Sequence, residues 1–391
     1  MVVPSYNDID LTNTNLLCGF YSIGLIEQYY SNIKVIDACQ WRKNGSGDRH
    51  GGKGYKWLNN KIKAHLLDEK IVLVIPEDEE VMYPSDARFT SVLNSYIDDE
   101  VYLVTQLLDF SIYWNAGINC KMLELPWMML NDCLCYTSIV NQHSRLPPTK
   151  TNKFNYLTFV GRKQEHKIAL LDQLCNSGLA KYGLLTVMSE HCHNNLHQKT
   201  KEMCTINHKH PYQEYKEYYH GDIQHKLYND DIKGFMEGGF AHIDGIWVSA
   251  NVVNFMHIRD KYQDVPLVVH SETTTGIFPM TEKSVWPILL GKLFLINGHK
   301  GVMSEIQRFY DIDISTFANL NFDTIEDGWS EKADVHRIKC MILDNKDLIK
   351  DASNVHDKLE TELKKASYTF GENMYNFFIS QLDKIITKEI T

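Results

Sequence analysis

Short apolar runs alternate along the chain with segments in which apolar residues recur every third or fourth position. The first pattern is typical of strands buried on both faces, and the second of helices that pack on one side. Such an alternation predicts an α/β protein whose sheets are covered by helices. The predicted strands include residues 33–38, 71–75, 154–160, 184–188, 266–270 and 293–296, and the predicted helices residues 16–30, 166–175, 281–290, 299–310 and 353–389.

Three stretches interrupt this alternation. Residues 44–54 are basic and rich in glycine, which predicts a loop, and residues 190–230 are rich in His, Tyr, Asn and Lys and are expected to be irregular. Residues 143–153 contain two adjacent prolines between polar flanks, which is typical of a linker. We therefore expect two α/β domains, residues 1–148 and 149–350, followed by a helix in residues 351–391 that packs on the body.

Composition and charge narrow the classes of protein that fit. The formal net charge of −10 disfavours non-specific binding of polyanions over most of the surface, although residues 41–56 form a local basic cluster. The nine cysteines include no CxxC pair, as expected of reduced thiols. The beginning of the sequence does not resemble a signal peptide, and the apolar runs are too short to span a bilayer. These features predict a soluble, cytoplasmic protein without a membrane partner.

The segment 265–301 contains the strongest indication of chemistry. A buried strand leads into a polar loop, and a helix is predicted to begin at Thr281, with Glu282 and Lys283 in its first turn. In open α/β sheets this carboxyl edge binds ligands, and a helix N-terminus with a nearby lysine suits a phosphate. Glu282 can accept hydrogen bonds from ribose or sugar hydroxyls. The alternative is an ordinary capped helix, because Thr and Glu are common at these positions.

The segment Met-Thr-Glu-Lys-Ser-Val-Trp-Pro-Ile-Leu-Leu-Gly-Lys-Leu-Phe resembles the donor-site motif of fucosyltransferase-like glycosyltransferases. It is still more similar to predicted glycosyltransferases of bacteriophages and large viruses. Two further motifs of that group appear in order, as residues 161–171 upstream and residues 322–327 downstream. The resemblance covers a little over half of the chain, and it implies a GT-B-like fold of two Rossmann-like domains that face each other across a cleft.

The resemblance also implies roles for individual residues. Glu282 is expected to contact the ribose or sugar of the donor, and Lys283 its diphosphate. Lys167 occupies the position where these families usually have an arginine, and a lysine cannot form the bidentate fork of a guanidinium. The predicted donor-binding residues are Arg162, Lys163, Lys167, Ser271, Glu272, Thr281, Glu282 and Lys283.

The chemistry that follows from the resemblance is transfer of a sugar from a nucleotide-sugar, such as a UDP- or GDP-sugar, to a hydroxyl acceptor. The expected reaction is inverting and needs no obligatory cofactor or metal, because basic side chains and a helix N-terminus stabilise the leaving diphosphate. A base from the N-terminal domain is then required. Asp37 and Glu77 are the preferred candidates, with His50, Asp78 and Asp109 as alternatives.

The sequence indicates less about the acceptor than about the donor. Arg49, His50 and Lys53 in the glycine-rich segment are candidates for binding an acceptor phosphate. The viral resemblance makes a hydroxymethylated base in phage DNA one candidate acceptor, and a glycan or a protein are the others. Two other classes of protein remain open. One is a non-catalytic protein that binds a nucleotide or glycan on the same fold, and the other a zinc protein that uses His191, His193 and Cys204.

Overall fold

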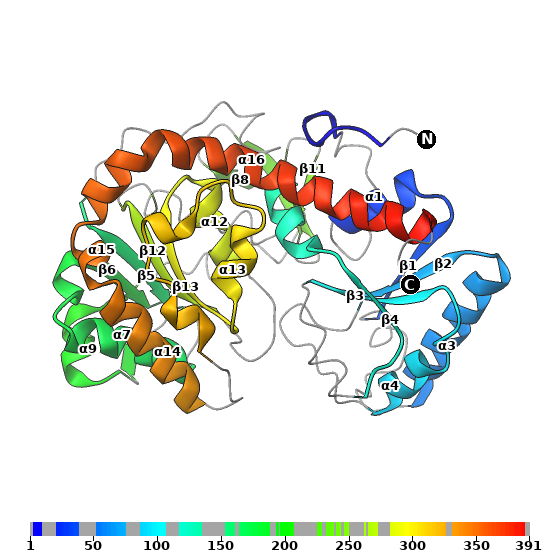
Figure 1. Ribbon diagram of the computed structural model, residues 1–391, viewed down its shortest axis with the longest axis horizontal. Coiled ribbons are helices and arrows are strands. Elements are labelled where there is room, and N and C mark those ends of the chain that lie inside the picture. The colour runs from blue at the N-terminus through cyan, green and yellow to red at the C-terminus, as the bar shows by residue number, and fades with distance from the viewer. Residues whose placement is uncertain are drawn as a thin grey trace. The chain divides into compact units, whose positions relative to one another are not determined.

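The computed structural model describes most of the 391-residue chain as a mixed α/β protein (Figure 1). The described residues are 3–9, 21–38, 52–75, 87–106, 117–134, 153–160, 164–187, 193–194, 196–206, 225–228, 232–237, 240–243, 246–249, 262, 265–272, 282–325 and 331–387. They group into two compact units: the first consists mainly of residues 1–131 and 374–391, and the second of residues 132–276 and 280–373. No helix in these ranges is both long and apolar enough to cross a membrane.

Unit 1 is built on a parallel sheet whose strands follow one another in chain order. The strands are β1 (Ile33–Asp37), β2 (Ile71–Ile75), β3 (Val101–Thr105) and β4 (Lys121–Glu124), and the sheet order is β1-β2-β3-β4. The helices around them are α1 (Tyr21–Tyr29), α3 (Gly52–Leu67) and α4 (Ala87–Asn94). All residues of β3 are buried, as are those of β2 apart from Ile71, as expected of central strands in a parallel sheet with both faces covered.

One hydrophobic core joins α3 and α4 to the same face of this sheet. Leu58 and Ile62 of α3 and Leu93 of α4 are at most 2% exposed and pack with Val72 and Val74 of β2. The two valines lie two positions apart and therefore point to one face. Because α3 joins β1 to β2 and α4 joins β2 to β3, and such crossovers are right-handed, the two helices are expected on one side of the sheet. Figure 1 shows α3 and α4 together beside the sheet.

Unit 2 contains a second parallel sheet, with a different strand order. Its strands are β5 (Tyr156–Val160), β6 (Gly183–Val187), β7 (Thr205–Ile206), β12 (Leu267–Ser271) and β13 (Leu293–Asn297), and their order is β13-β12-β5-β6-β7. From β5 the chain first adds strands on one side, and β12 then pairs with the other side of β5. The strand order therefore reverses between β5 and β12.

The helices of unit 2 include α7 (Glu165–Asn176), α9 (Gln198–Met203), α12 (Glu282–Leu289), α13 (Val302–Gln307), α14 (Glu331–Asp344) and α15 (Lys346–Lys350). Three short 3₁₀ turns are η3 (Ala180–Tyr182), η4 (Ile314–Thr316) and η5 (Asn321–Thr324). Aromatic packing stabilises the β13 side, where the buried Phe294 meets the rings of Tyr310 and Phe317 edge-on. The fully buried Arg337 of α14 donates to the Ile325 carbonyl at 2.8 Å and to the Gly298 carbonyl.

The C-terminal helix α16 (Ala352–Thr387) is close to the predicted range 353–389. Its residues up to 373 group with unit 2, and those from 374 onward group with unit 1. In unit 1 the Tyr375 hydroxyl donates to the Pro4 carbonyl at 2.9 Å, and the Tyr30 hydroxyl donates to Asp383 at 3.0 Å. These bonds attach the end of the helix to the N-terminal part of the chain.

Two predictions about irregular segments were partly wrong. Residues 190–230 include α9, β7 and the strand β8 (His225–Tyr228), and β8 begins an antiparallel sheet with β9 (Ile232–Glu237), β10 (Phe240–Ile243) and β11 (Ile246–Ser249). The glycine-rich segment contributes its last three residues, 52–54, to α3. In both segments the composition predicted too little regular structure. Strands and helices tolerate polar residues and glycine where neighbouring elements supply the packing and hydrogen bonds.

Gly183 at the start of β6 provides a test of the packing. A β-carbon at this position would overlap the ring of Tyr156, which is completely buried and donates to the Leu179 carbonyl at 3.2 Å. We expect Gly183→Ala to lower the free energy of unfolding by about 1–3 kcal/mol, measured by urea denaturation. In a Tyr156→Leu background the same change should cost less, and an equal cost in both backgrounds would contradict this packing.

Candidate functional site

The carboxyl edge of the unit 2 sheet, where the strand order reverses between β5 and β12, is the candidate site. Loops that follow two strands at such a point leave the sheet in different directions, which opens a crevice that binds ligands in many α/β proteins. Here α7 begins shortly after β5, and the polar residues His270, Ser271 and Glu272 end or follow β12. The next strand, β13, ends at Asn297 in register with Ser271.

Glu272 lies at the centre of this edge and is only 1% exposed. Its carboxyl group accepts a hydrogen bond from the Ser284 hydroxyl of α12. Its backbone N–H donates to the Asn297 carbonyl at 2.8 Å, and its carbonyl oxygen lies 2.8 Å from Nε2 of His166 in α7. One residue therefore connects the ends of two strands to the first turns of two helices.

His270 is the second buried titratable group at this edge. It lies two positions before Glu272, so both side chains are on the same face of the strand, and its Nε2 is 3.8 Å from Oε2 of Glu272. Burial lowers the pKa of His270 below its ordinary value of 6.5, and the positive charges of Lys167 and Lys283 lower that pKa further, against the opposing effect of Glu272. The imidazole is therefore neutral at pH 7.

The two lysines that act on His270 come from different helices. Lys167 is in the first turn of α7 and is almost fully buried, and Lys283 is in the first turn of α12 and is partly exposed. Each lies next to a residue that contacts Glu272, because His166 precedes Lys167 and Ser284 follows Lys283. The N-cap residue of α7, Gln164, makes no capping hydrogen bond with its side chain. Two cations and a helix N-terminus at one sheet edge favour an anionic ligand.

A polar pair lies beside this cluster. The Asn297 side chain donates to the Ser271 hydroxyl at 2.9 Å, and both residues are at most 1% exposed. The amide oxygen of Asn297 has no hydrogen-bond partner in the described part of the chain, nor does Nε2 of His270. Buried polar atoms are usually paired with protein, water or ligand. Two buried polar atoms with unused hydrogen-bonding capacity thus lie at the same edge.

Four of the predicted donor-binding residues come together at this edge: Lys167, Ser271, Glu272 and Lys283. Arg162, Lys163 and Thr281 lie outside the described residues, and Glu282 begins α12 with only its backbone described. His166, His270, Ser284 and Asn297 are further polar residues of this edge that the sequence did not indicate. The available signal for His270 is its place in the polar run that ends an apolar strand, whereas the role of Ser284 depends on how α12 packs.

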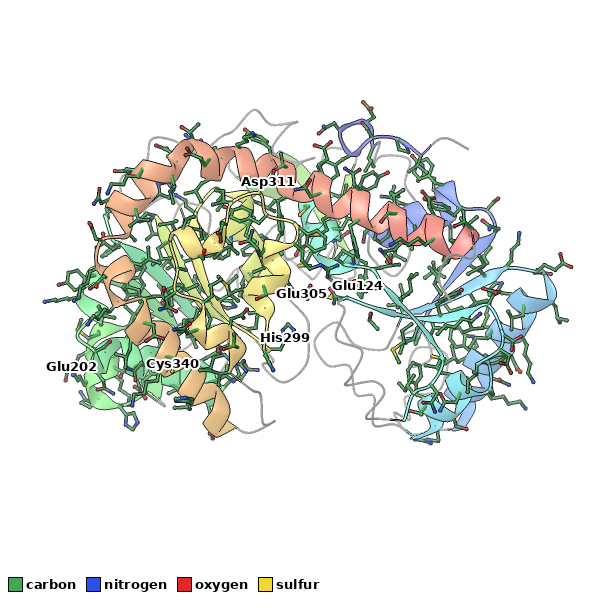
Figure 2. The ribbon with its side chains drawn as sticks, viewed as in Figure 1. Glu124, Glu202, His299, Glu305, Asp311 and Cys340 are labelled. Atoms are coloured by element: carbon green, nitrogen blue, oxygen red, sulfur yellow. The ribbon has the colours of Figure 1, made fainter. Side chains whose placement is uncertain are left out.

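The predicted bases and acceptor residues of unit 1 are described only in part. Asp37 is the last residue of β1 and Lys53 lies in the first turn of α3, both with the backbone alone described. Arg49, His50, Glu77, Asp78 and Asp109 lie outside the described residues. The structure adds Glu124, which ends β4 at the same carboxyl edge and is only 3% exposed (Figure 2).

Three acidic residues in sequence motifs have structural roles. The carboxylate of Asp323, in the downstream motif, accepts hydrogen bonds from the Met303 and Ser304 backbone N–H groups at 3.0 Å each, and so caps α13. Asp311 (Figure 2) accepts from Asn373 of α16 at 3.0 Å, and Asp313 accepts from the Ser315 N–H at 2.9 Å. Asp311 and Asp313 therefore form hydrogen bonds within their own unit, Asp311 to α16 and Asp313 to the next turn.

The proposed zinc ligands do not form a cluster within the described residues. Nε2 of His193 lies 3.1 Å from the Lys201 carbonyl, and burial raises the pKa of the Cys204 thiol to about 12. A raised pKa disfavours the thiolate that binds zinc. His191 lies outside the described residues, and no group of three or more His, Cys, Asp or Glu side chains in the described ranges is arranged to hold a metal.

Comparison with known proteins gives no relative. No protein-family model matches the chain, and no curated protein or solved structure is significantly similar to it. The fold and the site therefore define a class only: a mixed α/β protein with two parallel sheets, and a cationic, largely buried polar cluster where the strand order of the second sheet reverses.

The neutral state of His270 predicts a specific pH dependence of stability. Unfolded histidine binds a proton near pH 6.5, whereas the folded protein resists protonation of His270, so stability should fall as the pH decreases below about 6.5. The limiting slope for one proton is about 1.4 kcal/mol per pH unit.

We expect His270→Asn to reduce the slope of the free energy of unfolding against pH, measured by urea denaturation between about pH 6.5 and 5. His336→Asn, at an exposed position of α14, should leave that slope unchanged. Equal slopes in all three proteins would argue against this environment.

Proposed function

We propose that the protein is a glycosyltransferase of the GT-B type, which transfers a sugar from a nucleotide-sugar donor to a hydroxyl acceptor. The observation that carries the proposal is the position of Lys167 and Lys283, next to His166 and Ser284 in the first turns of two helices that contact Glu272 at the edge where the strand order of unit 2 reverses. Two parallel sheets in two compact units also agree with it. The motif resemblance supplies the reaction class, and the position of the lysines supports a donor site at this edge.

In this proposal the lysines hold the diphosphate of the donor. Lys283 is partly exposed, whereas the buried Lys167 adds a charge of fixed position close to the α7 N-terminus. The charge of a leaving diphosphate grows as its bond to the sugar breaks, and preorganised cations with low solvent exposure stabilise that change most strongly. The site thus replaces a metal ion with two ammonium groups and backbone N–H groups.

Glu272 and His270 are positioning residues in this scheme. Glu272 fixes the first turns of α7 and α12 relative to the strand ends, through His166 and Ser284. A neutral His270 adds no further positive charge beside the two lysines. In this scheme Glu272 holds the helix starts in place and does not bind the ligand. A buried carboxyl group is therefore compatible with an anionic ligand at the same edge.

The transfer itself is a displacement at the anomeric carbon. The oxygen of the acceptor hydroxyl forms a bond to that carbon, the bond to the diphosphate oxygen breaks, and the hydroxyl proton passes to a base. Asp37 and Glu77 are the proposed bases, and inversion at the anomeric carbon follows from a single displacement. Candidate acceptors are a hydroxymethylated base in DNA, a glycan and a protein.

A thermal-shift screen against UDP-, GDP-, ADP- and CMP-linked sugars tests the donor site. A donor at about a hundredfold excess over its Kd should stabilise the protein by about 2.7 kcal/mol. We expect one nucleotide class to raise the melting temperature, Lys283→Gln to reduce the shift, and Lys339→Gln on the outside of α14 to preserve it.

The outcomes separate the candidate functions. Slow hydrolysis of the stabilising nucleotide-sugar without an acceptor would indicate an enzyme, whereas a shift without hydrolysis would favour a non-catalytic protein that binds the same ligand. No shift with any nucleotide, in a sample that unfolds cooperatively, would reject the donor site. A shift that Lys283→Gln leaves intact would place the ligand elsewhere in the molecule.

A further inference from the structure

A histidine and a cysteine lie side by side on the outer face of α14. His336 and Cys340 are four residues apart, and Nε2 of His336 lies 3.9 Å from Sγ of Cys340. His336 is exposed and Cys340 partly exposed, whereas Ile338 and Met341 of the same helix are completely buried in unit 2. Residues four apart share one face of a helix. The pair is therefore directed to the surface, and Cys340 is labelled on α14 in Figure 2.

Cys340 differs from the other cysteines whose side chains are described. These are Cys120, Cys133, Cys175 and Cys204, and all four are buried. A buried cysteine acts as a small apolar residue, an explanation that does not extend to a thiol that water reaches. Burial and Asp344 raise the pKa of Cys340, against the opposing effect of Lys339. Because a metal ion displaces the proton of a thiol that it binds, the raised pKa is compatible with a metal ligand.

The distance between the two side chains fits a single zinc ion. Zn–S bonds are about 2.3 Å long and Zn–N bonds about 2.0–2.1 Å, so tetrahedral coordination places the two ligand atoms about 3.6 Å apart. The separation of 3.9 Å needs only a small side-chain rotation to reach that value. Thiolate and imidazole are ligands that zinc prefers. Two ligands four residues apart on a helix also form part of known zinc sites.

Two ligands supply only half of a structural zinc site. Such sites almost always have four protein ligands, and no third His, Cys, Asp or Glu in the described ranges joins this pair. A second copy of the chain, related by a two-fold axis through the metal, would present the same two residues and complete a Cys₂His₂ set.

The surface around the pair suits contact with a second copy. Val335 directly precedes His336 and is 44% exposed, and Leu343 is 39% exposed. Leu343 lies seven residues after His336, which places it on the same face of α14. Two large apolar side chains thus flank the pair in water, and a symmetric contact at the metal would cover them.

We propose that His336 and Cys340 form half of a zinc site that a second copy of the chain completes, so that zinc joins two copies at their α14 helices. Each Cys340 thiol releases its proton to solvent as Sγ binds the ion, and each neutral His336 binds through Nε2. The two thiolates balance the charge of Zn²⁺, and no oxidation state changes. The proposal does not rest on the proposed transferase function, because it uses no residue of the sheet edge.

Sedimentation velocity of the full chain tests the proposal, with Zn²⁺ or with a chelator, in a phosphine reductant that prevents disulfides. We expect a monomer with chelator and a dimer with Zn²⁺, which retains about half an equivalent more zinc per chain than C340S does. C340S and H336N should weaken the zinc-dependent dimer at least roughly tenfold, the loss that even outer partners of a zinc ligand cause. The control is H197N, which removes a histidine that is 83% exposed before α9 and should dimerise like the original.

Cobalt provides a spectroscopic test of the same ligands. Co²⁺ in place of Zn²⁺ should produce thiolate-to-cobalt charge-transfer absorption in the original chain and in H197N, and C340S should lack it. Dimers that persist with chelator, zinc bound without dimerisation, or a zinc-dependent dimer that C340S and H336N form equally well would each overturn the proposal. The thermal shift with nucleotide-sugars should persist in C340S, so failure of the zinc site and failure of the donor site are distinguishable.

Discussion

The strand ends and helix starts of the second unit are arranged around the buried carboxyl group of Glu272. A carboxyl group removed from water is costly unless it gains hydrogen bonds or compensating charge, and Glu272 is only 1% exposed. Ser284 supplies the hydrogen bond from α12, and the backbone of Glu272 contacts His166 and Asn297. Strand ends and helix starts that are far apart in the sequence are thereby held together.

The electrostatics of the site follow from that arrangement. The helix starts that meet Glu272 also bring Lys167 and Lys283 close to His270, whose neutral state is enforced by burial and by those two charges. A buried polar cluster of this kind tolerates few rearrangements, because each unmade hydrogen bond or unpaired charge inside it is expensive. The contacts that stabilise the fold therefore also hold the helix starts that carry the two lysines.

Charge is distributed very differently in the two units. In unit 2 two lysines lie in the first turns of helices that contact a buried carboxyl group at the edge of a sheet, whereas Lys56, Lys61 and Lys63 of α3 in unit 1 are exposed. The first arrangement suits a small anion held in a defined geometry. The net charge of the chain does not indicate either arrangement.

The sequence by itself determined most of the helices and strands and the α/β class of the protein. The apolar runs predicted β1, β2, β5, β6, β12 and β13 within a few residues, because strands buried on both faces need continuous apolar sequence. Periodicity likewise predicted α7, α12 and α16, but composition did not reveal α9 or the sheet β8–β11. Only the tertiary structure decided that the strand order reverses between β5 and β12, and that Ser284 and His166 meet Glu272. Those contacts join residues from separate elements, and their pairing is set by the packing of the whole unit, which no local pattern records.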